Sequence, residues 1–196
     1  MTVVDVGLLL LGLSVGLTVA AHGAQKAFGW WGGPGPTGWR GTIASMGFQP
    51  ARLFAALSTA AELVGGLSLA LGLFTSIGAA LVVAQSVVII FHVHWQRGFW
   101  NTGRGIEYPM QLAVVAVVLG LAGRGALSLD GALATPGLFG VGGLTGFEHV
   151  IVLTPPLTLR VALLLGGAVA GSIALVVPHV VAGRRAVARR EHSGSH

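Results

Sequence analysis

Several polar side chains that could bind a ligand or move a proton lie inside, or at the ends of, strongly apolar segments of this sequence. They are His22, Lys26, Glu62, Gln85, His92 and Glu107. A charge at the centre of a bilayer costs about 2.5–3.5 kcal/mol on insertion scales, so each such group requires a polar partner. Ser58, Gly65 and Gly66 share the helical face of Glu62, at spacings of three and four. Because this face is small and polar, we expect Glu62 to point into a helix bundle.

Two kinds of chemistry suit these residue types. Mutually satisfied pairs, such as Lys26 with Glu107, would fasten helices together without any ligand. Alternatively, the carbonyl oxygens of a quinone or another small ligand would accept hydrogen bonds from His or Lys. The ring of such a ligand would need apolar walls, for which the nearby candidates are Phe91, Trp95 and Phe99. The sequence leaves both interpretations open and identifies no catalytic residue.

Metal chemistry is less favoured by the spacing of the histidines. Bis-histidine haem ligation would need His22 together with His92 or His94, and no helix shows the pair of well-spaced His typical of multi-haem cytochromes. His92 and His94 lie two residues apart, roughly 200° around a helix, so one helix cannot direct both toward a single ion. We therefore predict no metal site, and quinone rather than haem as the candidate cofactor.

Composition assigns the chain to membrane proteins. Of its 196 residues, 54% are hydrophobic and 9% are charged, and the mean hydropathy is +0.83. A soluble domain carries about 25% charged residues. The absence of Cys excludes disulfides and thiolate chemistry. The only dense basic run, at 184–190, adjoins an apolar segment and indicates a membrane-surface anchor rather than a nucleic-acid site.

Five apolar segments are long enough for a helix to cross roughly 30 Å of hydrocarbon. They cover residues 3–22, 53–73, 76–95, 107–123 and 158–182. We therefore predict an all-α, polytopic membrane helix bundle, with a tight hairpin at 74–76. Residues 138–153 are apolar but rich in Gly and are followed by Pro155 and Pro156, which favours a surface or re-entrant segment.

Basic residues predict the orientation of these spans. Of the 11 Lys and Arg residues, all except Arg124 and Arg160 fall in the first loop, the third loop or the C-terminal tail. The positive-inside rule then places these three regions in the cytoplasm and the N-terminus outside. In this arrangement Lys26, His92 and Glu107 gather at the cytoplasmic end, where we expect them to form a shared site.

The first loop, at about 23–52, is aromatic and rich in Gly and Pro. It contains Phe28, Trp30, Trp31 and Trp39. Trp prefers the headgroup layer, so an interfacial belt is the first interpretation. A lid over a ligand, made of the same aromatic side chains, is the second.

Short motifs spread over about 3–132 are similar to the DoxX family of bacterial membrane proteins. They are 23–26 (GAQK), 62–66 (ELVGG), 71–75 (LGLFT), 92–95 (HVHW), 97–101 (RGFWN), 105–108 (GIEY) and 123–130 (GRGALSLD). The resemblance implies a four-helix transmembrane core over 1–132. To this core the chain would add a connecting segment at 133–157, a fifth helix at 158–183 and a disordered basic tail at 184–196.

The resemblance also implies a function. DoxX proteins are associated with sulfur and thiosulfate oxidation at the quinone pool, and in mycobacteria with complexes that contain a superoxide dismutase and a sulfurtransferase. We therefore expect a multi-pass accessory subunit of an oxidoreductase complex in the bacterial cytoplasmic membrane, with a quinone-facing pocket. Its partners would be the lipid bilayer and other subunits, not nucleic acid. The alternatives are a module that binds or transports a lipid-like or small ligand, and a purely structural subunit.

Overall fold

Helices form all the regular structure of the residues that the computed structural model describes, 1–134 and 156–193. The α-helices are α1 (Val3–Phe28), α2 (Gly35–Ser45), α3 (Ala51–Leu71), α4 (Thr75–Ile89), α5 (Glu107–Ala122), α6 (Leu129–Ala134) and α7 (Leu157–Ser193). Shorter helical turns are η1 (Trp30–Gly32), η2 (Ile90–His94), η3 (Trp95–Arg97) and η4 (Asn101–Gly103). The predicted all-α helix bundle is confirmed.

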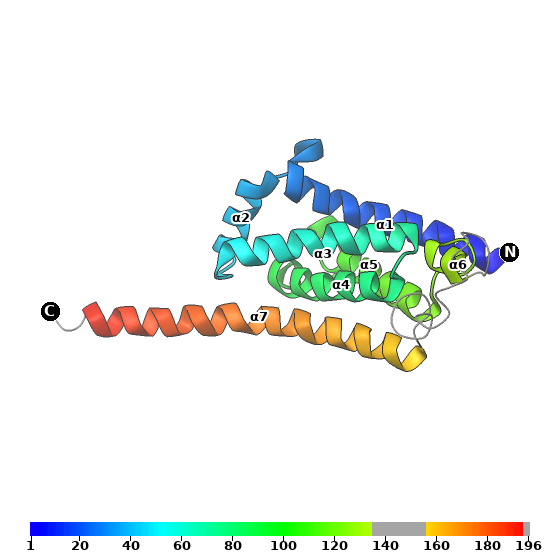
Figure 1. Cartoon of the computed structure of the whole chain (residues 1–196). Helices are drawn as coiled ribbons and strands as arrows, with labels where there is room; N and C mark the ends of the chain where they lie inside the picture. Colours follow the sequence, from blue (N-terminus) through cyan, green and yellow to red (C-terminus); the bar gives the residue numbers. More distant parts are fainter. Residues whose placement is uncertain (135–155, 194–196) are drawn as a thin grey trace.

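Along the bundle, α1 and α3, α3 and α4, and α4 and α5 run antiparallel to each other (Figure 1). In contrast, α7 runs parallel to α4, because Gly167 lies against Ala80 and Gly171 lies against Ala84. Among the described residues, four segments are long and apolar enough to cross a membrane: Val3–Phe28, Ala51–Leu71, Thr75–Arg97 and Leu157–Pro178. The fourth predicted span, α5, has 16 residues. At 1.5 Å per residue it reaches about 24 Å, which is shorter than the hydrocarbon layer.

Glycine brings α1 and α3 into backbone contact. A Cβ added to Gly16 would lie 2.3 Å from the backbone nitrogen of Ala70, and one added to Gly66 would lie 2.4 Å from that of Ala20. Any larger side chain at these positions would push the helices apart. This close approach lets Lys26, at the end of α1, reach a side chain that points inward from α3.

The predicted hairpin at 74–76 is present, because α3 ends at Leu71 and α4 begins at Thr75. Asp130, from α6, caps this turn. Its carboxylate accepts hydrogen bonds from the backbone nitrogens of Phe74 (2.9 Å) and Thr75 (3.1 Å) and from Thr75 Oγ1 (2.8 Å). The start of α4 is thus capped by a side chain from a distant segment.

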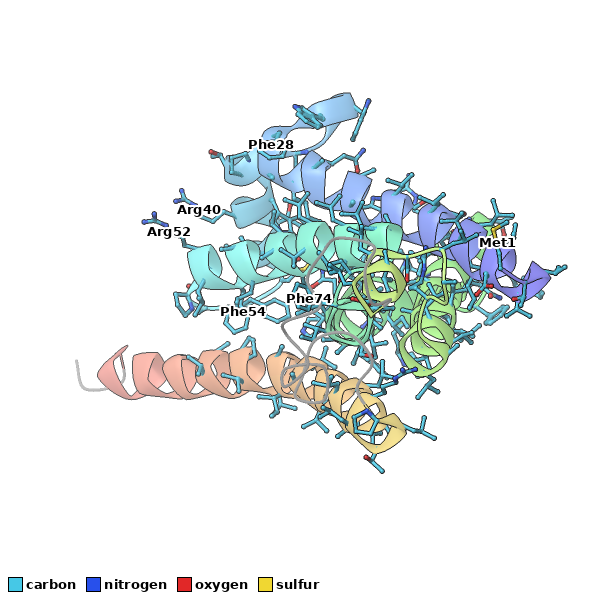
Figure 2. All side chains as sticks on the ribbon, turned by 45° about the vertical axis from the view of Figure 1, so that its right-hand side comes forward. Met1, Phe28, Arg40, Arg52, Phe54 and Phe74 are labelled. Atoms are coloured by element: carbon cyan, nitrogen blue, oxygen red, sulfur yellow. The ribbon has the colours of Figure 1, made fainter. Side chains whose placement is uncertain are left out.

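Beside this turn, Arg124 is 2% exposed and donates from Nη1 to the carbonyl oxygen of Leu69. Burial lowers the pKa of the Arg124 guanidinium, and attraction by Asp130 partly offsets this effect. Figure 2 shows Met1 at one end of the bundle and Phe28, Arg40 and Arg52 at the other. Asp5 in the first turn of α1 accepts a hydrogen bond from the backbone nitrogen of Ala126, so the Arg124 region lies at the Met1 end.

The helix α7 packs along α4 and extends past the end of the bundle (Figure 1). It continues to Ser193, so residues 184–193, expected to be part of a disordered tail, are helical here. Ala and Arg predominate in this stretch and both have high helix propensity, which the sequence interpretation underweighted. The segment 138–153, predicted to be a surface or re-entrant segment, lies outside the described residues.

Candidate functional site

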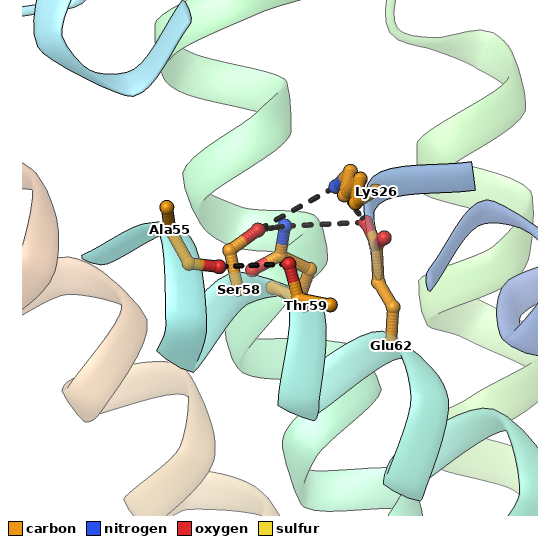
Figure 3. Close-up of polar contacts among 6 residues, drawn as sticks. Lys26, Ala55, Ser58, Thr59 and Glu62 are labelled. Atoms are coloured by element: carbon orange, nitrogen blue, oxygen red, sulfur yellow. Dashed lines mark hydrogen bonds and ion pairs between the residues drawn. The ribbon is translucent and has the colours of Figure 1, made fainter. Parts of the chain in front are cut away.

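A buried ion pair joins the last turn of α1 to α3, toward the end of the bundle opposite Met1. Lys26 Nζ lies 2.5 Å from Glu62 Oε1, and the two side chains are 11% and 5% exposed (Figure 3). Lys26 Nζ also lies 3.5 Å from Ser58 Oγ. From α4, Gln85 Nε2 donates to Ser58 Oγ at 2.8 Å and to Glu62 Oε1 at 3.3 Å. Four polar side chains from three helices are therefore linked to one another inside the apolar bundle, which is the kind of pairing that polar groups in lipid require.

The helix α2 covers this network from the loop side. Trp39 places its ring 3.9 Å from Lys26 Nζ, a cation–π contact. In contrast, Trp30 and Trp31 are 54% and 70% exposed and contact each other edge to face. The two interpretations of the aromatic loop thus apply to different residues: Trp39 covers the polar network, whereas Trp30 and Trp31 are placed as interfacial residues would be.

A cavity of about 420 Å³ adjoins the ion pair. Ligand cavities in proteins span roughly 300–1,000 Å³. The walls come from α1, α2, α3, α4, η2 and α5, and include Val19, Thr42, Met46, Val82, Ile89 and Leu112. Most of these wall residues are apolar, so a ligand here would contact hydrocarbon around a small polar patch.

Two buried polar atoms of residues that line this cavity have no hydrogen-bond partner among the described residues. They are Glu62 Oε2, an acceptor, and Trp39 Nε1, a donor. Glu62 is 4% exposed as a residue. A buried polar group without a partner costs about 1–3 kcal/mol. The cavity therefore offers an acceptor and a donor to a ligand that has both functions.

Comparison with protein families matches residues 7–95 to the family model described as DoxX. This stretch of the chain is therefore similar to a DoxX domain. The resemblance inferred from the motifs is confirmed over this range, which contains Lys26, Trp39, Glu62 and Gln85. Comparisons with curated proteins and with solved structures find no match.

Further polar groups from α1, η2 and α5 line the same cavity. His22 lies edge-on to the ring of Tyr108, with 6.4 Å between the ring centroids. His94 Nδ1 lies 2.5 Å from the carbonyl oxygen of Arg104. His94 and Tyr108 both line the cavity, yet neither was a candidate quinone ligand. Tyr108 follows Glu107 directly, and only the rotation of α5 shows which of the two faces the cavity.

His92 lies in a second, adjoining cavity of about 200 Å³ between α2, α3, α4 and α7. Its ring packs against Phe48, with the centroids 4.5 Å apart. Trp39, Gln85 and Val93 line both cavities, which therefore share a wall. His92 lies in η2, a π-helical turn that ends α4, so His92 and His94 line different cavities.

The expected ion pair between Lys26 and Glu107 was wrong. Lys26 pairs with Glu62, while Glu107 Oε2 accepts a hydrogen bond from the backbone nitrogen of Asn101 at 2.8 Å. Glu107 is the first residue of α5, so its carboxylate turns back to the preceding η4 turn rather than inward. Of the predicted residues, Lys26, Glu62, Gln85 and His22 line one cavity, His92 lines the next, and Glu107 lines neither.

Ser58 was noted as a neighbour of Glu62 but was not a site candidate, although it joins Gln85 to Lys26. Its position four residues before Glu62, on the same helical face, was the available signal. Within the described ranges, no group of three His, Cys, Asp or Glu side chains is arranged to hold a metal ion.

Proposed function

We propose that this protein is a membrane subunit of an oxidoreductase complex and that the 420 Å³ cavity beside Lys26 and Glu62 binds the head of a quinone. The observation that carries the proposal is the pair of unpartnered, buried atoms, Glu62 Oε2 and Trp39 Nε1. A quinone carbonyl accepts a hydrogen bond from an N–H donor, and a quinol hydroxyl donates one to a carboxylate. The quinone/quinol couple therefore matches both the Trp39 donor and the Glu62 acceptor.

The surrounding residues prepare Glu62 for this role. Lys26, held 2.5 Å from Oε1, offsets the desolvation cost of a carboxylate in an apolar bundle. Ser58 and Gln85 hold the pair in place through hydrogen bonds that involve Oε1 and not Oε2. When bound, a quinone would supply two-electron redox chemistry, and this chain would contribute orientation and a proton-accepting oxygen.

The second cavity supports an amphipathic ligand. At about 200 Å³ it is below the usual range for a complete ligand, yet it shares a wall with the larger cavity. Its lining includes Phe54, Leu57, Ala170 and Ala174, so it suits an apolar tail. A quinone with its head beside Glu62 would extend its tail between α3 and α7.

Trp39→Phe is the decisive variant, because it keeps an aromatic ring over Lys26 and removes only the N–H donor. Binding of decylubiquinone to the purified protein in detergent, measured by equilibrium dialysis, should weaken about fivefold, the loss of one hydrogen bond. Trp31→Phe, at an exposed position, is the matched control and should bind like the wild type. Equal binding by wild type and Trp39→Phe would contradict the proposal, as would no measurable binding by the wild type.

The second candidate is a purely structural subunit. It is favoured by the hydrogen bonds that Lys26 and Gln85 make to other side chains of the protein. This candidate predicts that variants of the network lose stability while the wild type binds no quinone. A module for a lipid-like ligand would instead retain phospholipid in the same cavity, which mass spectrometry of a solvent extract would identify.

The basic residues of the first and third loops support a cytoplasmic location for the cavity end in a bacterial plasma membrane. Reporter fusions at both termini test this orientation. An active periplasmic reporter at the C-terminus would contradict it.

A further inference from the structure

A groove of about 550 Å³ lies on the outside of the bundle, between α2, α3 and the end of α1. It is separate from the quinone cavity, although Lys26 and Trp39 form part of the wall of each. Small side chains on α3 line it, among them Ala56 and Ala60, and Val64 follows one turn further along the helix. The groove is therefore a shallow apolar trough that runs along α3.

Two arginines line the groove. Arg40 comes from α2 and Arg52 from the first turn of α3, and Figure 2 shows them next to each other at one end of the bundle. Both are exposed. Among the side chains that the structure describes, neither guanidinium has an ion pair or a hydrogen bond, and no Asp or Glu lines the groove. Lys26 is engaged by Glu62, so the charge available to a ligand comes from Arg40 and Arg52.

Aromatic residues indicate the depth of this end of the groove in the membrane. Phe28, Trp30 and Trp31 are each more than half exposed, and Phe28 lies at the same end of the bundle as Arg40 and Arg52 (Figure 2). Exposed Trp side chains mark the headgroup layer. Further along α3, Val64 and Leu67 are exposed, as expected of residues that face lipid chains. The groove therefore leads from the headgroup layer toward the hydrocarbon.

We propose that this groove binds one anionic phospholipid, with its phosphate between Arg40 and Arg52 and an acyl chain along Ala56, Ala60 and Val64. Guanidinium groups bind phosphate oxygens through paired, charge-assisted hydrogen bonds. A free anion would contact the arginines but would leave the apolar trough empty. A zwitterionic lipid would fill the trough, but its own positive headgroup charge would lie near the two arginines. The anionic lipid uses both features. This proposal does not depend on quinone binding.

Native mass spectrometry of the intact chain in detergent tests the proposal, with phosphatidylglycerol and phosphatidylcholine of identical acyl chains as probes. The wild type should retain phosphatidylglycerol preferentially. The double variant R40Q/R52Q should lose that preference by roughly tenfold to thirtyfold, given the contribution of each basic residue to binding an anionic headgroup. The matched control R97Q/R104Q removes two exposed arginines from the loop between α4 and α5, which do not line the groove, and should behave like the wild type.

Two further arms separate the sources of binding. Ala60→Phe fills the trough at an exposed position and should reduce phosphatidylglycerol retention, whereas Leu67→Phe, outside the groove, should not. Excess inorganic phosphate should displace little lipid. The proposal would be overturned by equal retention of the two lipids, by equal losses in R40Q/R52Q and R97Q/R104Q, by unchanged retention in Ala60→Phe, or by displacement with inorganic phosphate.

Discussion

The two ends of the bundle bury charged side chains in opposite ways. At the Met1 end, Asp130 has three hydrogen bonds to the turn between α3 and α4, and Arg124 fills the space above Gly12. At the other end, Lys26 and Glu62 are paired beside a cavity of about 420 Å³.

Buried charge alone therefore does not identify a ligand site. Arg124 also has two nitrogens, Nε and Nη2, that find no hydrogen-bond partner in the described part of the chain. However, a Cβ built on Gly12 would overlap its guanidinium, so no space separates Arg124 from α1. What distinguishes the Lys26 end is that its unpartnered atoms, Glu62 Oε2 and Trp39 Nε1, belong to residues that line an open volume. The Arg124 end holds the helices together, and the Lys26 end has room for a ligand.

The largest expected effect comes from breaking the pair at the cavity end. Lys26→Met leaves Glu62 as an uncompensated buried carboxylate and should cost about 3–5 kcal/mol of stability, and Glu62→Leu should cost a similar amount. The double variant Lys26→Met/Glu62→Leu should cost clearly less than the sum, because it leaves no unpaired charge. Thermal unfolding in detergent measures all three variants.

Glu62→Gln is the conservative control for this pair, since it keeps the shape and the hydrogen-bonding capacity of the side chain. It should be more stable than Glu62→Leu. Additive losses in the double variant would contradict the partnership of Lys26 with Glu62.

At the opposite end, Asp130→Ala should cost about 3 kcal/mol, because it removes charge-assisted hydrogen bonds from the backbone nitrogens of Phe74 and Thr75 and leaves Arg124 without its counter-charge. Quinone binding by the folded fraction should not change. Thermal unfolding and equilibrium dialysis on the same preparation measure both quantities. If Asp130→Ala instead lost quinone binding and kept the stability of the wild type, the distinction between the two ends would be removed.

The sequence predicted the fold well because the apolar windows correspond directly to helices. It also placed Glu62 correctly, since Ser58, Gly65 and Gly66 mark the face of α3 that packs inward. Each of these inferences needs only the periodicity of one helix.

Predicting the partner of Lys26 required more information than the sequence of one helix contains. Glu62 and Glu107 were both available carboxylates, and the choice depends on the close approach of α1 to α3 and on where α5 begins. The position of Trp39 was equally inaccessible, because residues 35–45 form a helix whose packing over Lys26 is tertiary. The motif at 123–130 was recognised as a resemblance, but its role in capping the turn at 74–75 required the structure.

The smallest expected effect concerns Glu107 and defines the boundary of the cavity end. Glu107→Gln removes a charge from the first turn of α5 and weakens one hydrogen bond from Asn101, so it should cost about 0.3–1 kcal/mol. Combined with Lys26→Met, its cost should add to within about 0.5 kcal/mol, because the two residues share no partner. The matched comparison is Lys26→Met with Glu62→Leu, where strong coupling is expected. A coupling energy between Lys26 and Glu107 as large as that between Lys26 and Glu62 would restore the ion pair expected from the sequence and extend the cavity end to the start of α5.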